Sequence, residues 1–295
     1  VDLEIQLAPS LSWNAMNEIR MNQSELFSTM GMYKESIDAL HSINKSELTR
    51  AEVIRYMDLF RSVYVTMASY ALTNQSRGDY LRISEAYRDT LLSLYSPDDK
   101  RYVRLLANRL IRQKKYKEAI ETINRIPSSQ IKGHMEGLLA FDKASAYRGM
   151  HDTDLEISSL AKSAIVDIRL SVKEYMSLYM LALLLYKRGE IERAYTYLKC
   201  SMDDAVFCNA RFRTISIAQS YPVIENAYQL KFQKAQRIRQ GLTWIISILL
   251  CFLIVTVIYI YRQMQKLSIA RKETSDINLQ LKELNERLYG VNQKL

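Results

Sequence analysis

Glycine and proline are scarce in this chain, which has 8 Gly and 4 Pro among 295 residues. Because β-hairpins and tight turns depend on these two residues, a fold rich in β-sheet is disfavoured. Leucine, isoleucine, methionine, alanine, lysine, arginine and glutamate dominate between the few breaks, and most of these are good helix formers. The composition therefore predicts an all-α protein.

Cysteine and histidine are equally rare, with three of each. Cys200 and Cys208 lie on one predicted helix, about 12 Å apart along its axis, which is too far for a disulfide. Cys251 falls inside an apolar stretch. The chain has no CxxC motif, and its histidines are scattered at His41, His134 and His151. We therefore predict no metal site, no redox site and no cofactor.

Catalytic motifs are also missing. There is no glycine-rich phosphate loop and no GxSxG, and the acidic pairs Asp98/Asp99 and Asp203/Asp204 are adjacent, so on a helix they point about 100° apart. The C-terminal helical region carries no histidine of the kind that a membrane histidine kinase phosphorylates. We predict that the chain is not an enzyme and assign it no catalytic residue.

Charge is absent from the 21 residues Gly241–Tyr261, GLTWIISILLCFLIVTVIYIY. As a helix this run is about 32 Å long, which matches the roughly 30 Å hydrocarbon core of a bilayer. Trp244, Tyr259 and Tyr261 lie near its ends, where amphipathic rings prefer the headgroup layer. A buried core helix is the alternative, but core helices are seldom apolar on every face over such a length. We predict a transmembrane helix.

The net charge of +9 is concentrated beside this stretch. Residues 231–240 carry four bases and no acid, and residues 262–295 carry seven bases and four acids, whereas residues 1–230 are nearly neutral. This placement favours anionic lipid headgroups over nucleic acid. The positive-inside rule is tied, because four bases flank the run on each side: Lys231, Lys234, Arg237 and Arg239 before it, and Arg262, Lys266, Arg271 and Lys272 after it.

Four segments before residue 200 share one pattern, in which a tight turn is followed by small or apolar residues five and nine positions later. The turns are at Gly31, Lys114, Met150 and Gly189, and the last three are spaced 36 and 39 residues apart. The following pairs are Ser36 and Leu40, Ala119 and Ile123, Leu160 and Ala164 (less regular), and Ala194 and Leu198.

This spacing is close to the period of about 34 residues in tetratricopeptide repeats, which stack as helix pairs into a solenoid with a concave face. Residues 48–95 fit the pattern poorly, and we interpret them as degenerate repeats. An ordinary helical bundle is the alternative. Pro97, Pro127 and Pro222 are predicted to mark turns between helices.

The C-terminal residues show heptad spacing. A juxtamembrane helix is predicted from Pro222, and beyond the apolar run a seam of residues recurs by three and four, which is typical of a coiled coil and favours a homodimer. A solvated amphipathic helix is the alternative. The seam residues are Leu267, Ala270, Thr274, Ile277, Leu281, Leu284, Leu288, Val291 and Leu295. The predicted domains are a repeat domain at 1–221, a juxtamembrane helix at 222–240, a transmembrane helix at 241–261 and a coiled coil at 262–295.

Residues 163–229 resemble the tetratricopeptide-repeat, membrane-spanning transcriptional regulators of Bacteroides-type bacteria. The marks of the resemblance are Ser163-Ala164-Ile165 with Asp167-Ile168, Lys173-Glu174, Gly189 with Arg193-Ala194-Tyr195, and Asp204-Ala205 with Cys208-Asn209-Ala210-Arg211. The order of repeats, span and coiled coil is also similar. The resemblance implies periplasmic repeats, a single pass through the inner membrane and a cytoplasmic coiled coil followed by a LuxR-type helix-turn-helix.

We expect this sequence, which begins Val1-Asp2 and stops at Leu295, to be a processed form or a fragment, so that DNA binding belongs to a domain absent here. The first hypothesis is a membrane signalling protein whose repeats sense a peptide, a glycan or a partner protein and control transcription. The alternative is a membrane-anchored scaffold for protein–protein interaction. The ligand-binding residues are unknown; tyrosines near arginines, such as Tyr95, Tyr195 and Tyr197, either line a groove or pack between helices.

Overall fold

Every regular element that the structure describes is a helix. The structure is a computed structural model that describes residues 13–173 and 176–292, and it has no strand in those two ranges. Four residues named above lie outside these two ranges: Val1, Asp2, Glu174 and Leu295. The all-α prediction is confirmed for the part of the chain that is described.

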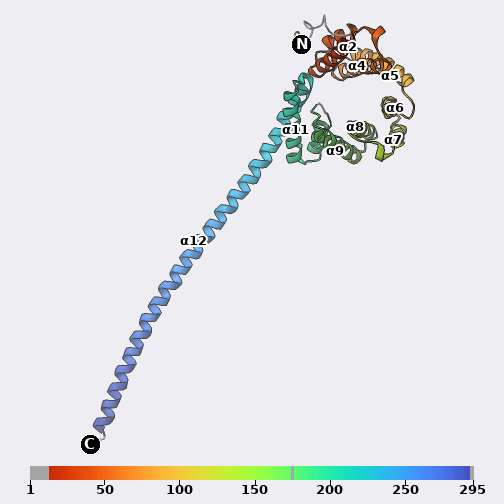
Figure 1. The fold of residues 1–295 in the computed structure, drawn as a ribbon. Coiled ribbons are helices and arrows are strands. Elements are labelled where there is room, and N and C mark those ends of the chain that lie inside the picture. The colour runs from red at the N-terminus through yellow and green to blue at the C-terminus, as the bar shows by residue number, and fades with distance from the viewer. Residues whose placement is uncertain (1–12, 174–175, 293–295) are drawn as a thin grey trace. The chain divides into compact units, whose positions relative to one another are not determined.

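The helices follow one another in antiparallel pairs. The chain divides into a first compact unit, Val1–Tyr228, and a second, Gln229–Leu295. The elements in chain order are α2 (Trp13–Met30), α3 (Tyr33–His41), η2 (Lys45–Glu47), α4 (Arg50–Tyr70), α5 (Asn74–Leu94), α6 (Lys100–Arg112), α7 (Tyr116–Asn124), η3 (Ser128–Gln130), α8 (His134–Gly149), α9 (Thr153–Arg169), α10 (Ser177–Lys187), α11 (Ile191–Phe207) and α12 (Arg211–Asn292). Figure 1 shows the pairs α4/α5 and α8/α9 side by side.

The four turns predicted from the sequence are the turns within helix pairs. Gly31 and Gly189 have φ angles of +80° and +82°, and Lys114 and His151 both have φ of +60°, so each pair reverses through one left-handed residue. All eight residues predicted to follow these turns are buried, with exposed fractions of 0–3%. The repeat interpretation is therefore confirmed at the level of helix pairs.

Side-chain caps mark the starts of α4, α5, α6 and α9. Thr49 and Glu52 form a reciprocal capping box at the start of α4. The side chains of Thr73 and Asp99 accept hydrogen bonds from the first turns of α5 and α6. Residues 48–95, which match the repeat pattern least, form two helices of 21 residues each that pack on one another.

The prediction of a turn at Pro222 is wrong. Pro97 and Pro127 do lie between helices, but Pro222 lies inside α12, which begins at Arg211. A proline within a helix removes one backbone hydrogen bond and usually bends or ends the helix. Ile217 and Ile224, on either side of it, are both buried against one hydrophobic cluster, and this packing holds the helix through the proline.

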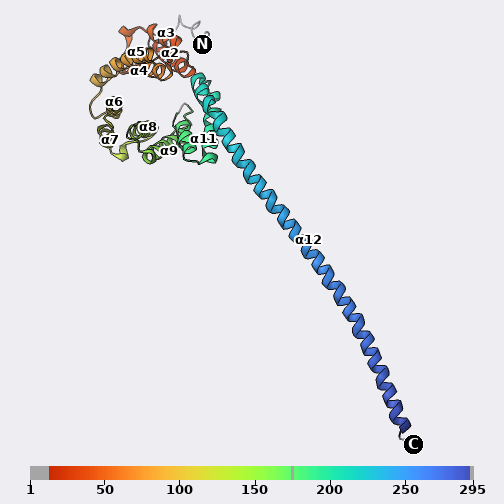
Figure 2. The ribbon, with the colours of Figure 1, turned by 180° about the vertical axis from the view of Figure 1, so that it is seen from behind.

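The second unit consists of the continuation of α12 (Figure 2). Among the described residues, α12 is the one helix that is both long enough and apolar enough to cross a membrane. None of its most apolar 18-residue stretch is buried. The seam side chains Leu267, Ile277, Leu281 and Leu284 are also exposed. The membrane span, the coiled coil and the bounds of the four predicted domains remain predictions.

Candidate functional site

The first unit contains a cavity of about 790 Å³ lined by residues from both ends of the repeat domain. The first side is formed by α2, α3 and α4. The second side is formed by α8, α10 and the first turns of α12, together with Met176 and Ala210. Residues more than 140 positions apart in the sequence thus share one cavity, because the helix pairs curve until the last approaches the first.

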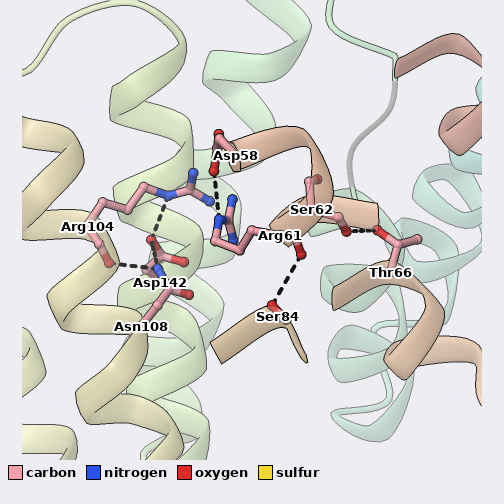
Figure 3. Close-up of polar contacts among 8 residues, drawn as sticks. All are labelled: Asp58, Arg61, Ser62, Thr66, Ser84, Arg104, Asn108 and Asp142. Carbon is pink, nitrogen blue, oxygen red and sulfur yellow. Dashed lines mark hydrogen bonds and ion pairs between the residues drawn. The ribbon is translucent and has the colours of Figure 1, made fainter. Parts of the chain in front are cut away.

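One wall of the cavity is a stripe of hydroxyl groups on α4. Ser62, Thr66 and Ser69 recur at intervals of four and three residues, so they share one helix face, and the carboxylate of Asp58 lies four residues earlier on the same face. All four side chains line the cavity. Thr66 donates a hydrogen bond to the carbonyl oxygen of Ser62 at 2.9 Å, which fixes its hydroxyl against the helix (Figure 3). Ser28 and Thr29 of α2 extend this polar wall.

Aromatic rings form another part of the lining. Phe212, in the first turn of α12, stacks between Tyr33 of α3 and Tyr70 of α4, with ring centroids 5.4 Å and 5.1 Å away. Burial raises the pKa of both tyrosines, and at Tyr70 this effect exceeds the opposing attraction of Arg213. Both phenols are therefore neutral near pH 7 and can donate hydrogen bonds.

Hydrogen bonds join α12 to α10 and to Lys173. The Tyr179 hydroxyl of α10 donates to the Ser216 carbonyl at 3.1 Å, and the Arg213 guanidinium donates to the Lys173 carbonyl at 3.0 Å. Arg213 and Ser216 line the cavity as well. The start of α12 is thus both a structural element of the repeat domain and part of the cavity wall.

A polar network lies beside the hydroxyl stripe. Arg61 of α4 pairs with Asp58 at 2.6 Å, and Arg104 of α6 pairs with Asp142 of α8 at 3.0 Å. Asn108 donates a second hydrogen bond to Asp142 at 3.0 Å. Figure 3 shows the guanidinium groups of Arg61 and Arg104 directed toward the same space. Burial raises the pKa of Asp142, an effect larger than the lowering caused by Arg104 and Asn108.

The groups that line the cavity are suited to binding a small ligand. The cavity offers hydroxyl donors and acceptors next to aromatic faces, which orient a ligand through hydrogen bonds and ring contacts. Its two acids are already partnered, Asp58 by Arg61 and Glu25 by Arg55, the latter at 3.5 Å. Among residues 13–173 and 176–292, no group of three or more His, Cys, Asp or Glu residues could hold a metal ion.

The tyrosines that the sequence singled out lie elsewhere. Tyr95 stacks under the Arg101 guanidinium, Tyr195 stacks on Tyr228 at 4.3 Å, and Tyr197 contacts Arg193. None of these three tyrosines lines the cavity, which instead uses Tyr33, Tyr70 and Tyr179. The sequence does contain a pattern that indicates the cavity wall: the polar residues Asp58, Ser62, Thr66 and Ser69 recur at helical spacing. A polar stripe between apolar residues on a helix indicates a face that does not pack into the hydrophobic core.

Comparison with known families matches residues 1–219 to the SusR N-terminal TPR domain. No curated protein matches the chain. The match spans most of the chain and includes every lining residue of the cavity. Tetratricopeptide-type repeats are typically protein-interaction domains without catalytic activity. The four helix-pair turns, the buried residues that follow them and this match together show that the chain belongs to the family of the SusR N-terminal tetratricopeptide-repeat domain.

Proposed function

We propose that the repeat domain is the ligand sensor of a single-pass membrane signalling protein. The observation that carries this proposal is the position of α12, whose first turns supply Phe212, Arg213, Ser216 and Gln219 to the cavity wall. The same helix contains the apolar residues 241–261. A ligand in the cavity therefore contacts the element that would have to carry a signal into the bilayer.

The chemistry of the cavity favours a glycan over a peptide. A neutral polyhydroxylated ligand would hydrogen-bond to the stripe of Ser62, Thr66 and Ser69 while its ring faces contact aromatic side chains. A peptide terminus or charged side chain would compete with the existing ion pairs of Asp58 and Glu25. The volume of about 790 Å³ lies within the range of roughly 300–1,000 Å³ that is usual for small-ligand sites.

The remaining steps rest on the resemblance and on the predicted C-terminal region. The repeats would lie in the periplasm, residues 241–261 would span the inner membrane, and residues 262–295 would pair with a second copy in the cytoplasm. A change at the start of α12 would then alter that pairing and act on a transcription-regulating domain beyond Leu295. Such signalling requires the ligand to bind one arrangement of the repeat domain and α12 more tightly than another. A ligand that binds both arrangements equally does not shift the equilibrium between them.

The test compares two serine-to-tryptophan variants of the full chain in detergent. Ser62→Trp fills the cavity from an exposed position on its wall, and Ser93→Trp adds the same bulk to an exposed position on α5 outside it. Thermal unfolding is followed with a panel of neutral tetra- to hexasaccharides and with peptides of similar mass.

We expect at least one oligosaccharide to raise the Tm of the wild type and of Ser93→Trp but not that of Ser62→Trp. Stabilisation by peptides alone would reject the glycan. Equal stabilisation of both variants would reject the cavity as the binding site. If neither class of compound changes the Tm, small-ligand sensing by this cavity is contradicted.

A further inference from the structure

The repeat domain contains two separate hydrophobic clusters on either side of the junction between α5 and α6. The N-terminal cluster joins Met21, Leu40, Ile43, Tyr56 and Phe60, with Tyr87 of α5 packed against it. The next cluster begins at Val103 of α6 and continues through α7 and α8. Neither cluster contains described residues from both α5 and α6. We call α2–α5 the N-terminal half and α6–α11 with the start of α12 the C-terminal half.

Two ion pairs join these halves at α5 and α6. Arg112 of α6 pairs with Glu85 of α5 at 3.2 Å, and Arg109 pairs with Asp89 at 3.7 Å. Arg88 is buried in this junction, and its pKa is lowered by burial and by the nearby charge of Arg112. Its Nε has no hydrogen-bond partner among the described residues. Water can replace the partners of these ion pairs at modest cost in free energy. This junction therefore resists bending less than an apolar core does.

Another connection between the halves is the aromatic stack at the opposite end. Phe212 contacts Tyr33 and Tyr70 of the N-terminal half, and Gly31 lies so close that a Cβ there would be 2.6 Å from the Phe212 ring. Farther along α12, Ile217 and Ile224 belong to the cluster of α8–α11. The start of α12 is thus held by an apolar core on the C-terminal side and by this ring stack, which we call the clasp, on the N-terminal side.

The cavity lies between the two halves, with α2, α3 and α4 on one side and α8, α10 and α12 on the other. We propose that the N-terminal half turns about the polar α5–α6 junction, that this movement opens the clasp at Phe212, and that a cavity ligand holds the clasp closed. The ligand part of this inference rests on the proposed function. Hinge closure of this kind needs only a few junction residues to change while each packed core moves as a unit.

The experiment measures distances between spin labels in the full chain reconstituted in nanodiscs, with Cys200, Cys208 and Cys251 replaced by serine. One pair, Leu72→Cys and Ile215→Cys, reports across the clasp, because Leu72 follows α4, Ile215 is on α12 and both are exposed. A second pair, Met150→Cys and Val206→Cys, lies within the C-terminal half and is also exposed. The clasp is weakened by Phe212→Ala, with Phe207→Ala as the matched control on the exposed end of α11.

We expect Phe212→Ala to lengthen and broaden the 72–215 distance while the 150–206 distance stays as in the wild type. Phe207→Ala should change neither distance, and Phe212→Tyr, which keeps the ring stack, should restore the short 72–215 distance. An unchanged 72–215 distance in Phe212→Ala would overturn the clasp. Equal broadening of both pairs would show general loss of structure and would also overturn the hinge.

The ligand part is tested by adding the same neutral tetra- to hexasaccharides to the spin-labelled chain that retains Phe212. If an oligosaccharide narrows the distribution of distances between the labels at 72 and 215 and also raises the Tm, closure by the ligand is supported. A rise in Tm without narrowing overturns the coupling and leaves the proposed binding function standing. If no oligosaccharide has either effect, the binding function and closure by the ligand both fail, while the distances without ligand still decide whether the clasp and hinge exist.

Discussion

Gly31 lies against the ring of Phe212, and a Cβ built on Gly31 would be 2.6 Å from Phe212 Cδ2. The two residues are separated by most of the repeat domain in sequence, yet each limits the size of the other. Gly31 also has φ of +80°, so two requirements select glycine here: the left-handed turn between α2 and α3, and the close approach of α12.

Gly31→Ala should therefore destabilise the protein more than the same substitution at another turn glycine. Gly189 is the matched control, since its φ is +82° and, apart from its neighbours in the chain, no described residue comes within 4 Å of where its Cβ would stand. Both substitutions carry the left-handed penalty of about 1–2 kcal/mol. Gly31→Ala adds the clash with Phe212, and we expect a further loss of about 1–3 kcal/mol in the free energy of unfolding by urea. Phe212→Ala combined with Gly31→Ala should recover part of that loss; purely additive losses would contradict the contact.

Gly149→Ala should destabilise the packing of α7 on α8. A Cβ at Gly149 would be 2.2 Å from Cζ of Tyr116, so the ring must move out of its position. We expect a loss of about 1–3 kcal/mol in the free energy of unfolding. Gly78→Ala in α5 is the control, because it meets open space and should stabilise the helix by about 0.5–1 kcal/mol. Equal effects of the two substitutions would be inconsistent with this packing.

Asp142 should make the stability depend on pH. Burial raises the pKa of its carboxyl in the folded state above the unfolded value of about 3.9. The folded state then binds the proton more tightly, so the associated stability is fully present below the unfolded pKa and is lost as the pH rises through the folded pKa.

Asp142→Asn carries no titrating proton and should not show this loss. Urea unfolding of both proteins across a series of pH values measures the difference. The stability of the wild type relative to Asp142→Asn should fall as the pH rises through the window between the two pKa values. A difference that increases with pH over that window would mean that the attraction of Arg104, and not burial, dominates at Asp142.

The predicted homodimer can be tested along the seam of residues 262–295. In protein without native cysteines, Ile277→Cys and Leu284→Cys should each form a disulfide-linked dimer under mild oxidation in membranes, because seam residues of paired helices face one another. Glu286→Cys lies away from the seam and should cross-link much less. Similar cross-linking at all three positions would indicate random collision and contradict a coiled-coil dimer.

Local patterns in the sequence were sufficient for the helical class and for the helix pairs. Left-handed turns at Gly31 and Gly189, followed by buried residues such as Ala194 and Leu198, depend on interactions within about 40 residues, so their spacing is visible in the chain. Pro222 shows the limit of such reasoning, since its local preference for a helix boundary is overridden by the burial of Ile217 and Ile224 on either side.

An all-helical chain, the tetratricopeptide-type repeats and the charge-free run at 241–261 each follow from periodicity or composition within a short window, so the order of the amino acids is enough to specify them. The cavity and the clasp depend on packing between distant segments. Tyr33, Tyr70 and Phe212 are far apart in the chain, and only the accumulated rotation from one helix pair to the next, set by side-chain packing at every interface, brings them together.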